Sequence, residues 1–236
     1  MTRSLSIAAV TVALTLVSGL VAGCALTSKG PTRDPRIFRP ALETGSLPDS
    51  AAFTAPKPGG PALRIGRIKG SADLREDMAY RVSEVEVGFY EDRRWAERPE
   101  QYVRRALVRA LFERDGLGQI VGGNGPTLDV EVIGFEEVRG AAPQARVVLE
   151  YALHDEWTVI IARTIVVEKP IAGAGGPVDP SAFVTAISAA LREAVDRVAV
   201  DVGKGVRMAG PPPSGSGMTP VLVPVLVPVP VSTGAR

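Results

Sequence analysis

In two adjacent stretches of the chain, large apolar residues occur at every second position, and the phase of this alternation changes between the stretches. The alternating apolar residues are Met78, Tyr80 and Val82 in the first stretch, and Val85, Val87 and Phe89 in the second. A period of two is typical of a strand with one buried face. The change of phase across residues 83–84 therefore predicts a tight hairpin between two half-buried strands.

An amphipathic helix is predicted directly after this hairpin. The charged residues 91–94 lead to Trp95, and Pro99 then stands where helices favour proline as their first residue. The apolar residues with helical spacing are Val103, Ala106, Leu107, Ala110 and Leu111. Gly116 follows them, and a glycine in this position commonly ends a helix.

Further strands are predicted from apolar alternation at residues 63–70, 128–138, 147–153 and 157–167. The last three are expected to pair as an antiparallel meander, with a polar turn at residues 154–156. The final strand is apolar on both faces up to Arg163, which indicates a position near the centre of the sheet.

A long second helix is predicted near the end of the folded region. Asp179 precedes Pro180, a combination typical of a capping side chain followed by proline at the first helical position. An apolar stripe follows at Phe183, Ile187, Leu191, Ala194, Val195, Val198 and Val202. Gly203 and Gly205 are expected to close the helix, which should lie beside the first helix.

These elements predict an α+β domain at residues 61–208, with an antiparallel sheet of about five to six strands and two helices packed on one face. A flexible N-terminal tether at residues 24–60 and a C-terminal tail at residues 209–236 are expected to flank it. The Val-Leu-Val-Pro repeats of the tail are too short and too broken by proline to span a bilayer. The tail is expected to be disordered or extended, or alternatively to dock in a partner's groove or against a sheet edge.

Residues 1–23 have the anatomy of a bacterial lipoprotein signal peptide. Arg3 gives a positive start, an apolar run covers residues 7–21, and small residues precede Cys24. The apolar run is short for a membrane-spanning helix. The sequence Val-Ala-Gly-Cys at residues 21–24 resembles a lipobox, in which Cys24 becomes the lipidated first residue of the mature protein. The alternatives are an uncleaved anchor or a secreted chain with a stray thiol.

Charge and composition narrow the classes of function. The net charge is +1 and no basic stripe is present, so nucleic acid is not an expected partner. A single Cys and a single His are too few for a structural zinc site, and no metal or cofactor is expected. The glycines of residues 116–125 follow a helix and precede a strand, whereas a dinucleotide-binding loop follows a strand and opens a helix. They are therefore interpreted as turns.

No catalytic residues are expected. Ser-His-Asp chemistry would have to use His154, the only histidine, which falls in a predicted turn, and the chain has no G-x-S-x-G motif. The neighbouring carboxylates are Asp73, Glu76 and Asp77, and Glu136 and Glu137. They fall on predicted loops or strand ends, where solvated charge is the expectation. The chain is therefore predicted not to be an enzyme.

The order YRV, then VGFYEDRRWAERP, then a helix rich in Ala and Leu resembles one family of bacterial lipoproteins. This is the ABC-type transport auxiliary lipoprotein family, which includes the paraquat-inducible protein C lipoproteins that accompany Mce-type (mammalian cell entry) lipid transporters. The resemblance spans residues 63–202 and is strongest over residues 80–111. It also implies a short first strand at Ile37 and Phe38. The alternative is that the hairpin aromatics belong to the core of an unrelated small α+β domain.

The resemblance implies a non-catalytic auxiliary subunit of an ABC-powered Mce-type system that moves lipids across the cell envelope. The implied partners are the periplasmic substrate-conducting Mce protein and the ABC permease and ATPase, and a homo-oligomeric ring is among the arrangements it allows. It implies a multi-acyl lipid anchor on Cys24, and Ala25 in place of aspartate implies the outer membrane, with the domain facing the periplasm. The alternative function is a structural or assembly lipoprotein, such as a chaperone for an outer-membrane channel.

Overall fold

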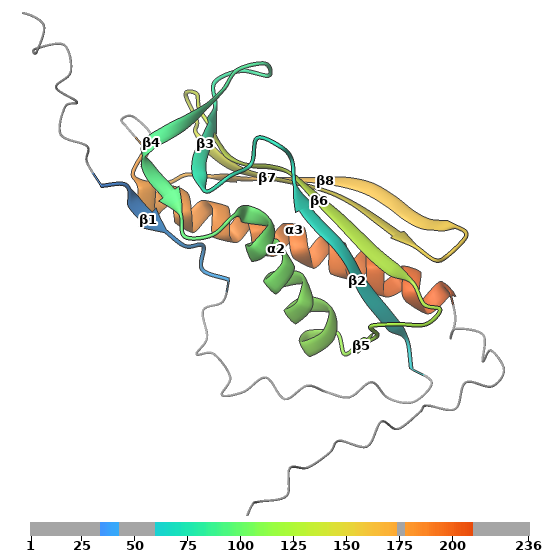
Figure 1. Ribbon diagram of the computed structural model, residues 1–236. Helices are drawn as coiled ribbons and strands as arrows, with labels where there is room; N and C mark the ends of the chain where they lie inside the picture. The colour runs from blue at the N-terminus through green and yellow to red at the C-terminus, as the bar shows by residue number, and fades with distance from the viewer. Residues whose placement is uncertain (1–33, 43–59, 174–177, 210–236) are drawn as a thin grey trace, which may run out of the picture.

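Two helices cover one face of a mixed β-sheet in the computed structural model of the chain (Figure 1). The structure describes residues 34–42, 60–173 and 178–209. The α+β class is therefore confirmed. The expected signal peptide, most of the expected tether and the expected tail lie outside the described residues.

The elements follow one another in this order. The strands are β1 (Arg36–Phe38), β2 (Ala62–Gly70), β3 (Asp77–Arg81), β4 (Val87–Trp95), β5 (Gly118–Gln119), β6 (Thr127–Val138), β7 (Gln144–His154) and β8 (Val159–Pro170). The helices are α2 (Pro99–Val108), which continues into the π-helical turn η2 (Arg109–Arg114), and α3 (Pro180–Ala209). Neither described helix is long and apolar enough to cross a membrane.

The central strand of the sheet is β6. On one side β6 pairs antiparallel with β7, and on the other side β2 pairs with its first half and β3 with its second half, both parallel. β4 and then β1 continue beyond β3, and β5 continues beyond β2. The prediction of a purely antiparallel sheet of about five to six strands is therefore wrong: the described residues form eight strands, partly parallel. The parallel pairs arise because α2 carries the chain back before β6 begins.

The strand β8 lies at the edge of the sheet, because within the described residues it pairs only with β7. The prediction that this strand sits near the sheet centre is therefore wrong. Its apolar residues beyond Arg163 do pack inward at Ile165 and Val167, which are 9% and 3% exposed. The chain then leaves β8 for α3 and adds no further described strand.

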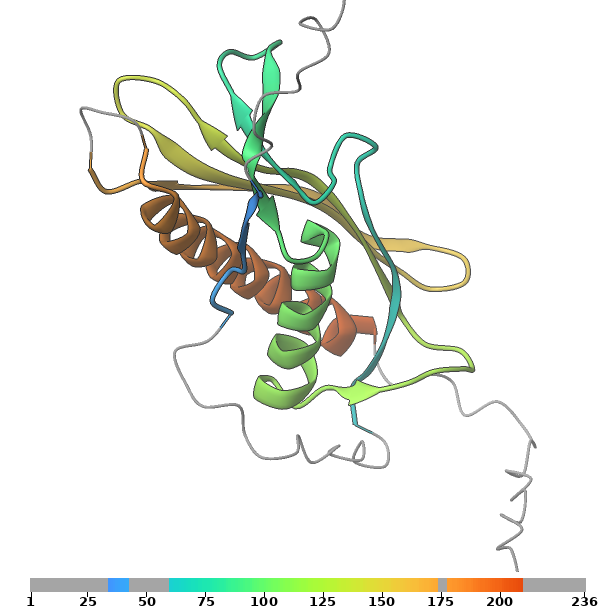
Figure 2. The ribbon, with the colours of Figure 1, turned by 60° about the vertical axis from the view of Figure 1, so that its left-hand side comes forward.

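The predicted hairpin is confirmed as β3 and β4, which pair antiparallel and project from the sheet (Figure 2). The predicted short first strand is confirmed as β1, which pairs parallel with the end of β4. The charged residues 91–94 belong to β4 rather than to a connection. They bring Trp95 into the core, where its ring packs edge-on against Tyr102 and Phe135.

Both helices begin as predicted. Pro99 is the first residue of α2, and the Asp179 carboxylate accepts a hydrogen bond from the Ala182 backbone N–H at the start of α3. The prediction that Gly203 and Gly205 close the second helix is wrong, because α3 continues to Ala209. Gly205 serves close packing instead, since both Leu153 and Ile161 approach the position that a Cβ would occupy.

Candidate functional site

Cys24, the only residue predicted to be modified, lies outside the described residues. The structure therefore leaves its lipidation as a prediction. The candidate side chains that the structure does place are His154, the acidic residues singled out above and the charged residues of the exposed sheet face.

His154 lies at the end of β7, in a setting that does not suit a catalytic base. Its Nδ1 is 2.9 Å from the backbone oxygen of Asp155, and its Nε2 is 3.3 Å from an oxygen of Asp129. The Asp155 carbonyl and then the Asp129 carboxylate raise the pKa of the imidazole above its ordinary value. Within the described residues, none of its hydrogen bonds reaches a serine, threonine or cysteine that it could activate.

The prediction of solvated charge is wrong for Glu136 and Glu137, whose residues are 4% and 1% exposed. Arg81 binds Glu136 with two hydrogen bonds, from Nε over 2.7 Å and from Nη2 over 3.2 Å. The hydroxyl of Tyr90 donates to Glu137 over 2.6 Å, and Arg139 forms a longer ion pair with the same carboxylate at 3.7 Å. Burial raises the pKa of the Tyr90 hydroxyl.

We call these five residues, Arg81, Tyr90, Glu136, Glu137 and Arg139, the hairpin clamp. They fasten β3 and β4 to the second half of β6, and the Arg139 guanidinium lies 3.3 Å from the centre of the Tyr80 ring. Each buried carboxylate has a cationic partner, so neither is left free for acid–base chemistry. The sequence did not identify the clamp, because its members come from β3, β4, β6 and the residue after β6, and the parallel pairing of β3 with β6 was not predicted.

The other acidic residues lie nearer the surface. The carboxylate of Asp77 pairs with Arg94 at 3.1 Å, and Asp73 accepts a hydrogen bond from Ser71 over 2.6 Å. The described residues contain no group of three His, Cys, Asp or Glu side chains placed to hold a metal ion. Asp77 and Asp73 thus act as partners of a basic group and a hydroxyl group, and Glu76 is exposed as predicted.

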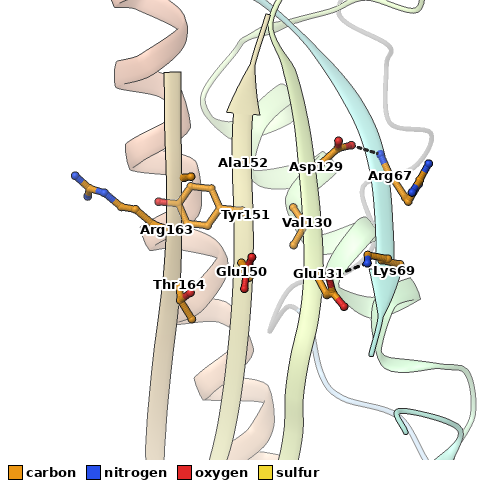
Figure 3. Close-up of a pocket in the computed structure, with 11 residues that line it drawn as sticks. Arg67, Lys69, Asp129, Val130, Glu131, Glu150, Tyr151, Ala152, Arg163 and Thr164 are labelled. Atoms are coloured by element: carbon orange, nitrogen blue, oxygen red, sulfur yellow. Dashed lines mark hydrogen bonds and ion pairs between the residues drawn. The ribbon is translucent and has the colours of Figure 1, made fainter. Parts of the chain in front are cut away.

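The face of the sheet opposite the helices carries a shallow pocket of about 510 Å³ between β2, β6, β7 and β8 (Figure 3). Lys69 pairs with Glu131 at 2.8 Å across β2 and β6. Glu131 stands directly opposite Glu150 on β7, and Glu150 stands opposite Thr164 on β8. We call the side of the sheet that carries this row the open sheet face.

Among the described residues, the open sheet face provides charge but no pair of groups placed to react with each other. Ala152 and Ala162 lie opposite each other on β7 and β8, and their small side chains leave the space that forms the pocket. Asp129 accepts a hydrogen bond from the backbone N–H of Arg67 over 2.6 Å, which fixes its carboxylate at the rim. Like charges directly opposite each other, as at Glu131 and Glu150, are unfavourable in an isolated sheet. This arrangement suits a surface that meets a polar partner better than a reaction centre.

Comparison with known proteins defines the family. Two crystal structures have the same fold. One is a DUF330-family protein from Xanthomonas campestris, with a TM-score of 0.58 and 19% identity, and the match covers 74% of this chain and 98% of that chain. The other is an uncharacterized protein, with a TM-score of 0.54 and 16% identity, and the match covers 72% of this chain and 99% of that chain. No curated protein matches the sequence. Residues 46–199, more than half of the chain, match the model of the ABC-type transport auxiliary lipoprotein component. The chain therefore belongs to the ABC-type transport auxiliary lipoprotein family.

Proposed function

We propose that this protein is a non-catalytic, lipid-anchored auxiliary subunit of an ABC-powered, Mce-type system that moves lipids across the cell envelope. The family match over residues 46–199 is the observation that carries the proposal. The hairpin sequence that resembles Mce-associated lipoproteins supports the choice of system. The sequence has no Walker motif, so ATP would be used by another subunit.

The site geometry supports a binding role rather than catalysis. In the hairpin clamp, Glu136 is paired with Arg81, and Glu137 is held by Tyr90 and Arg139. His154 has no nucleophile beside it in the described residues. The open sheet face offers exposed charge to a partner. In this proposal the periplasmic Mce-type component is the direct partner, and the permease and ATPase are held through it.

The proposal is tested by purifying the protein from membranes and identifying bound proteins by mass spectrometry. Recovery of an Mce-type protein with its permease and ATPase would support the proposal. Recovery of an outer-membrane channel alone would favour the assembly lipoprotein instead. The variant Glu150→Lys places a positive charge on the open sheet face and should lower recovery of the partner. Glu156→Lys, an equal charge change in the loop after β7, should not.

Anchoring forms a separate part of the proposal, in which Cys24 carries the lipid and the outer membrane is the destination. Two or more acyl chains anchor a protein stably, whereas a protein without them is released. Cys24→Ala should move the protein from the membrane to the soluble fraction, and an unchanged membrane fraction would count against lipidation. By the enteric sorting rule, Ala25→Asp should shift the protein from outer to inner membranes on a density gradient.

A further inference from the structure

The strand β8 presents the longest free edge of the described sheet. It has 12 residues, whereas the strands at the other borders, β1 and β5, have 3 and 2. A free edge offers unpaired backbone N–H and C=O groups to another strand, and proteins usually protect long edges with proline, bulges or a covering segment. In β8 the only proline is the last residue, Pro170, and the register irregularity lies at the other end, between Val159 and Ile161. The stretch between them carries charged residues at 163, 168 and 169, but within the described residues no proline, bulge or paired strand protects it.

Apolar side chains along this edge are also uncovered. Val159 and Val166 on β8 are 60% and 44% exposed, and Trp157 in the preceding turn is 87% exposed. A solvent-facing edge strand normally carries polar residues on its outer side. The edge thus combines unpaired backbone groups with exposed apolar side chains.

The sequence contains a segment that matches this edge. Residues 221–231 read VLVPVLVPVPV, and the prolines at and within this segment are Pro220, Pro224, Pro228 and Pro230, all at even positions. In an extended strand, the backbone groups of alternate residues point to opposite edges. The edge formed by the even-numbered residues therefore lacks an N–H donor at each proline. The odd edge, residues 221 to 231, consists entirely of valines with their N–H groups intact.

The linker between α3 and this segment has almost no spare length for antiparallel pairing with β8 of the same molecule. Helix α3 ends at Ala209, and its residue Gly205 packs beside Ile161 in the first part of β8. An antiparallel strand would have to begin near Pro170, at the far end of β8. The linker, residues 210–220, extends at most about 36 Å. Returning along β8 requires about 30 Å or more, and the linker must also pass from the helix layer to the sheet edge.

A parallel strand in the same molecule meets a different obstacle. In Figure 3 the helices lie behind the sheet, β8 is the leftmost strand, and it runs downward from Arg163 to Thr164. If the view is rotated by half a turn within the plane of the page, β8 points upward, its free edge lies on the right, and α3 remains behind the sheet. A strand added there after α3 would complete a left-handed crossover, whereas about 98% of such connections are right-handed.

We infer that the free edge of β8 accepts residues 221–231 of a second copy of this chain as an added strand. The odd-numbered valines bond to β8, and the proline edge faces outward and ends the sheet. The segment of 11 residues matches the 12 residues of β8 in length. The contact is independent of the transport function proposed above, because it joins copies of the chain to each other and involves neither the open sheet face nor Cys24.

Two proline variants test the inference. They differ only in whether the new proline lies at an odd-numbered position, on the bonding edge, or at an even-numbered position, on the outer edge. The full chain is purified from membranes in mild detergent, and the number of copies per particle is measured by native mass spectrometry. The unaltered chain is expected to be multimeric. Val225→Pro removes a donor from the bonding edge and should raise the dissociation constant by at least about tenfold. Leu226→Pro adds the same residue to the edge that already carries proline and should leave assembly unchanged.

Hydrogen exchange then locates the contact. The β8 amides that do not bond to β7 should be protected in the unaltered chain and in Leu226→Pro, and should lose protection in Val225→Pro. Circular dichroism verifies that the variants are folded. Equal behaviour of the two variants, or multimers with unprotected β8 amides, would overturn the inference. A monomer with protected β8 amides would overturn it in favour of pairing within one molecule.

Discussion

The hydroxyl of Tyr90 on β4 donates a 2.6 Å hydrogen bond to the carboxylate of Glu137 on β6, a residue that is 1% exposed. These strands are not neighbours in the sheet, because β3 lies between them. The bond therefore spans β3 and joins the projecting hairpin to the central strand. A buried carboxylate needs such donors, since its charge has little access to water.

Tyr90→Phe is expected to destabilise the protein by about 1–3 kcal/mol, because it removes a hydrogen bond to a buried charged group while keeping the ring. Chemical denaturation followed by circular dichroism measures the free energy of unfolding. Tyr80→Phe is the matched control, since within the described residues the Tyr80 hydroxyl has no hydrogen-bond partner and its ring contact with Arg139 is retained. Equal losses in the two variants would show that Glu137 does not depend on Tyr90.

The two tryptophans of the chain should differ sharply in their effect on stability. Trp95 is 3% exposed and packs against the rings of Tyr102, Phe135 and Phe183. Trp95→Ala should therefore cost about 3–5 kcal/mol. Trp157 is 87% exposed, and Trp157→Ala should change the free energy of unfolding by less than about 0.5 kcal/mol. Urea titrations of both variants followed by circular dichroism provide the comparison, and a small effect at Trp95 would contradict the packing.

Local patterns in the sequence predicted the elements well. The phase change near residues 83–84 located the β3–β4 hairpin, and Pro99 and Pro180 marked both helix starts, because turn and cap preferences act over a few residues. Gly116 also ends the first helical segment as predicted, with a φ of +67° that favours glycine. These features depend on neighbours along the chain, so one sequence is enough to find them.

Relations between distant segments were not predictable in the same way. The apolar pattern of β8 fits a central strand as well as an edge strand that packs on a helix, and only the sheet order decides between them. The sequence predicts Glu136 and Glu137 as surface charges, because their partners Arg81 and Tyr90 lie 55 and 47 residues away along the chain. The predicted lipidation site, Cys24, is a sequence motif alone and lies outside the described residues.

His154 should titrate above its ordinary pKa, because the carbonyl of Asp155 and the carboxylate of Asp129 both favour the protonated ring. As the only histidine, it gives a single set of imidazole signals for an NMR titration. A pKa raised in the folded state stabilises the fold below the unfolded value of about 6.5. That contribution is lost as the pH rises through the folded-state pKa.

Asp129→Asn should lower the pKa of His154 only in part, because the Asp155 carbonyl remains in place. The same variant should flatten the fall in stability above about pH 6.5. A control is Asp73→Asn, whose side chain bonds to Ser71 and not to the histidine. A pKa of His154 below the ordinary value would contradict both contacts.

Gly203 and Gly205 lie inside α3 and should respond differently to alanine. The three atoms nearest to a Cβ on Gly203 all belong to the guanidinium of Arg207, the first at 3.1 Å, and that flexible side chain can move aside. A Cβ on Gly205 would lie 2.7 Å from Leu153 and 2.8 Å from Ile161, both in the packed layer between helix and sheet. Such distances require the core side chains to shift.

Gly203→Ala is therefore expected to stabilise the protein by about 0.5–1 kcal/mol, the usual gain when alanine replaces glycine within a helix. Gly205→Ala has the same intrinsic helix preference but must displace core side chains, so it should be less stable than Gly203→Ala by about 1 kcal/mol or more. Thermal unfolding of the two variants, measured under identical conditions, isolates the packing effect because the propensity change cancels. If Gly205→Ala were the more stable variant, helix α3 could not pack against β7 and β8 as closely as described.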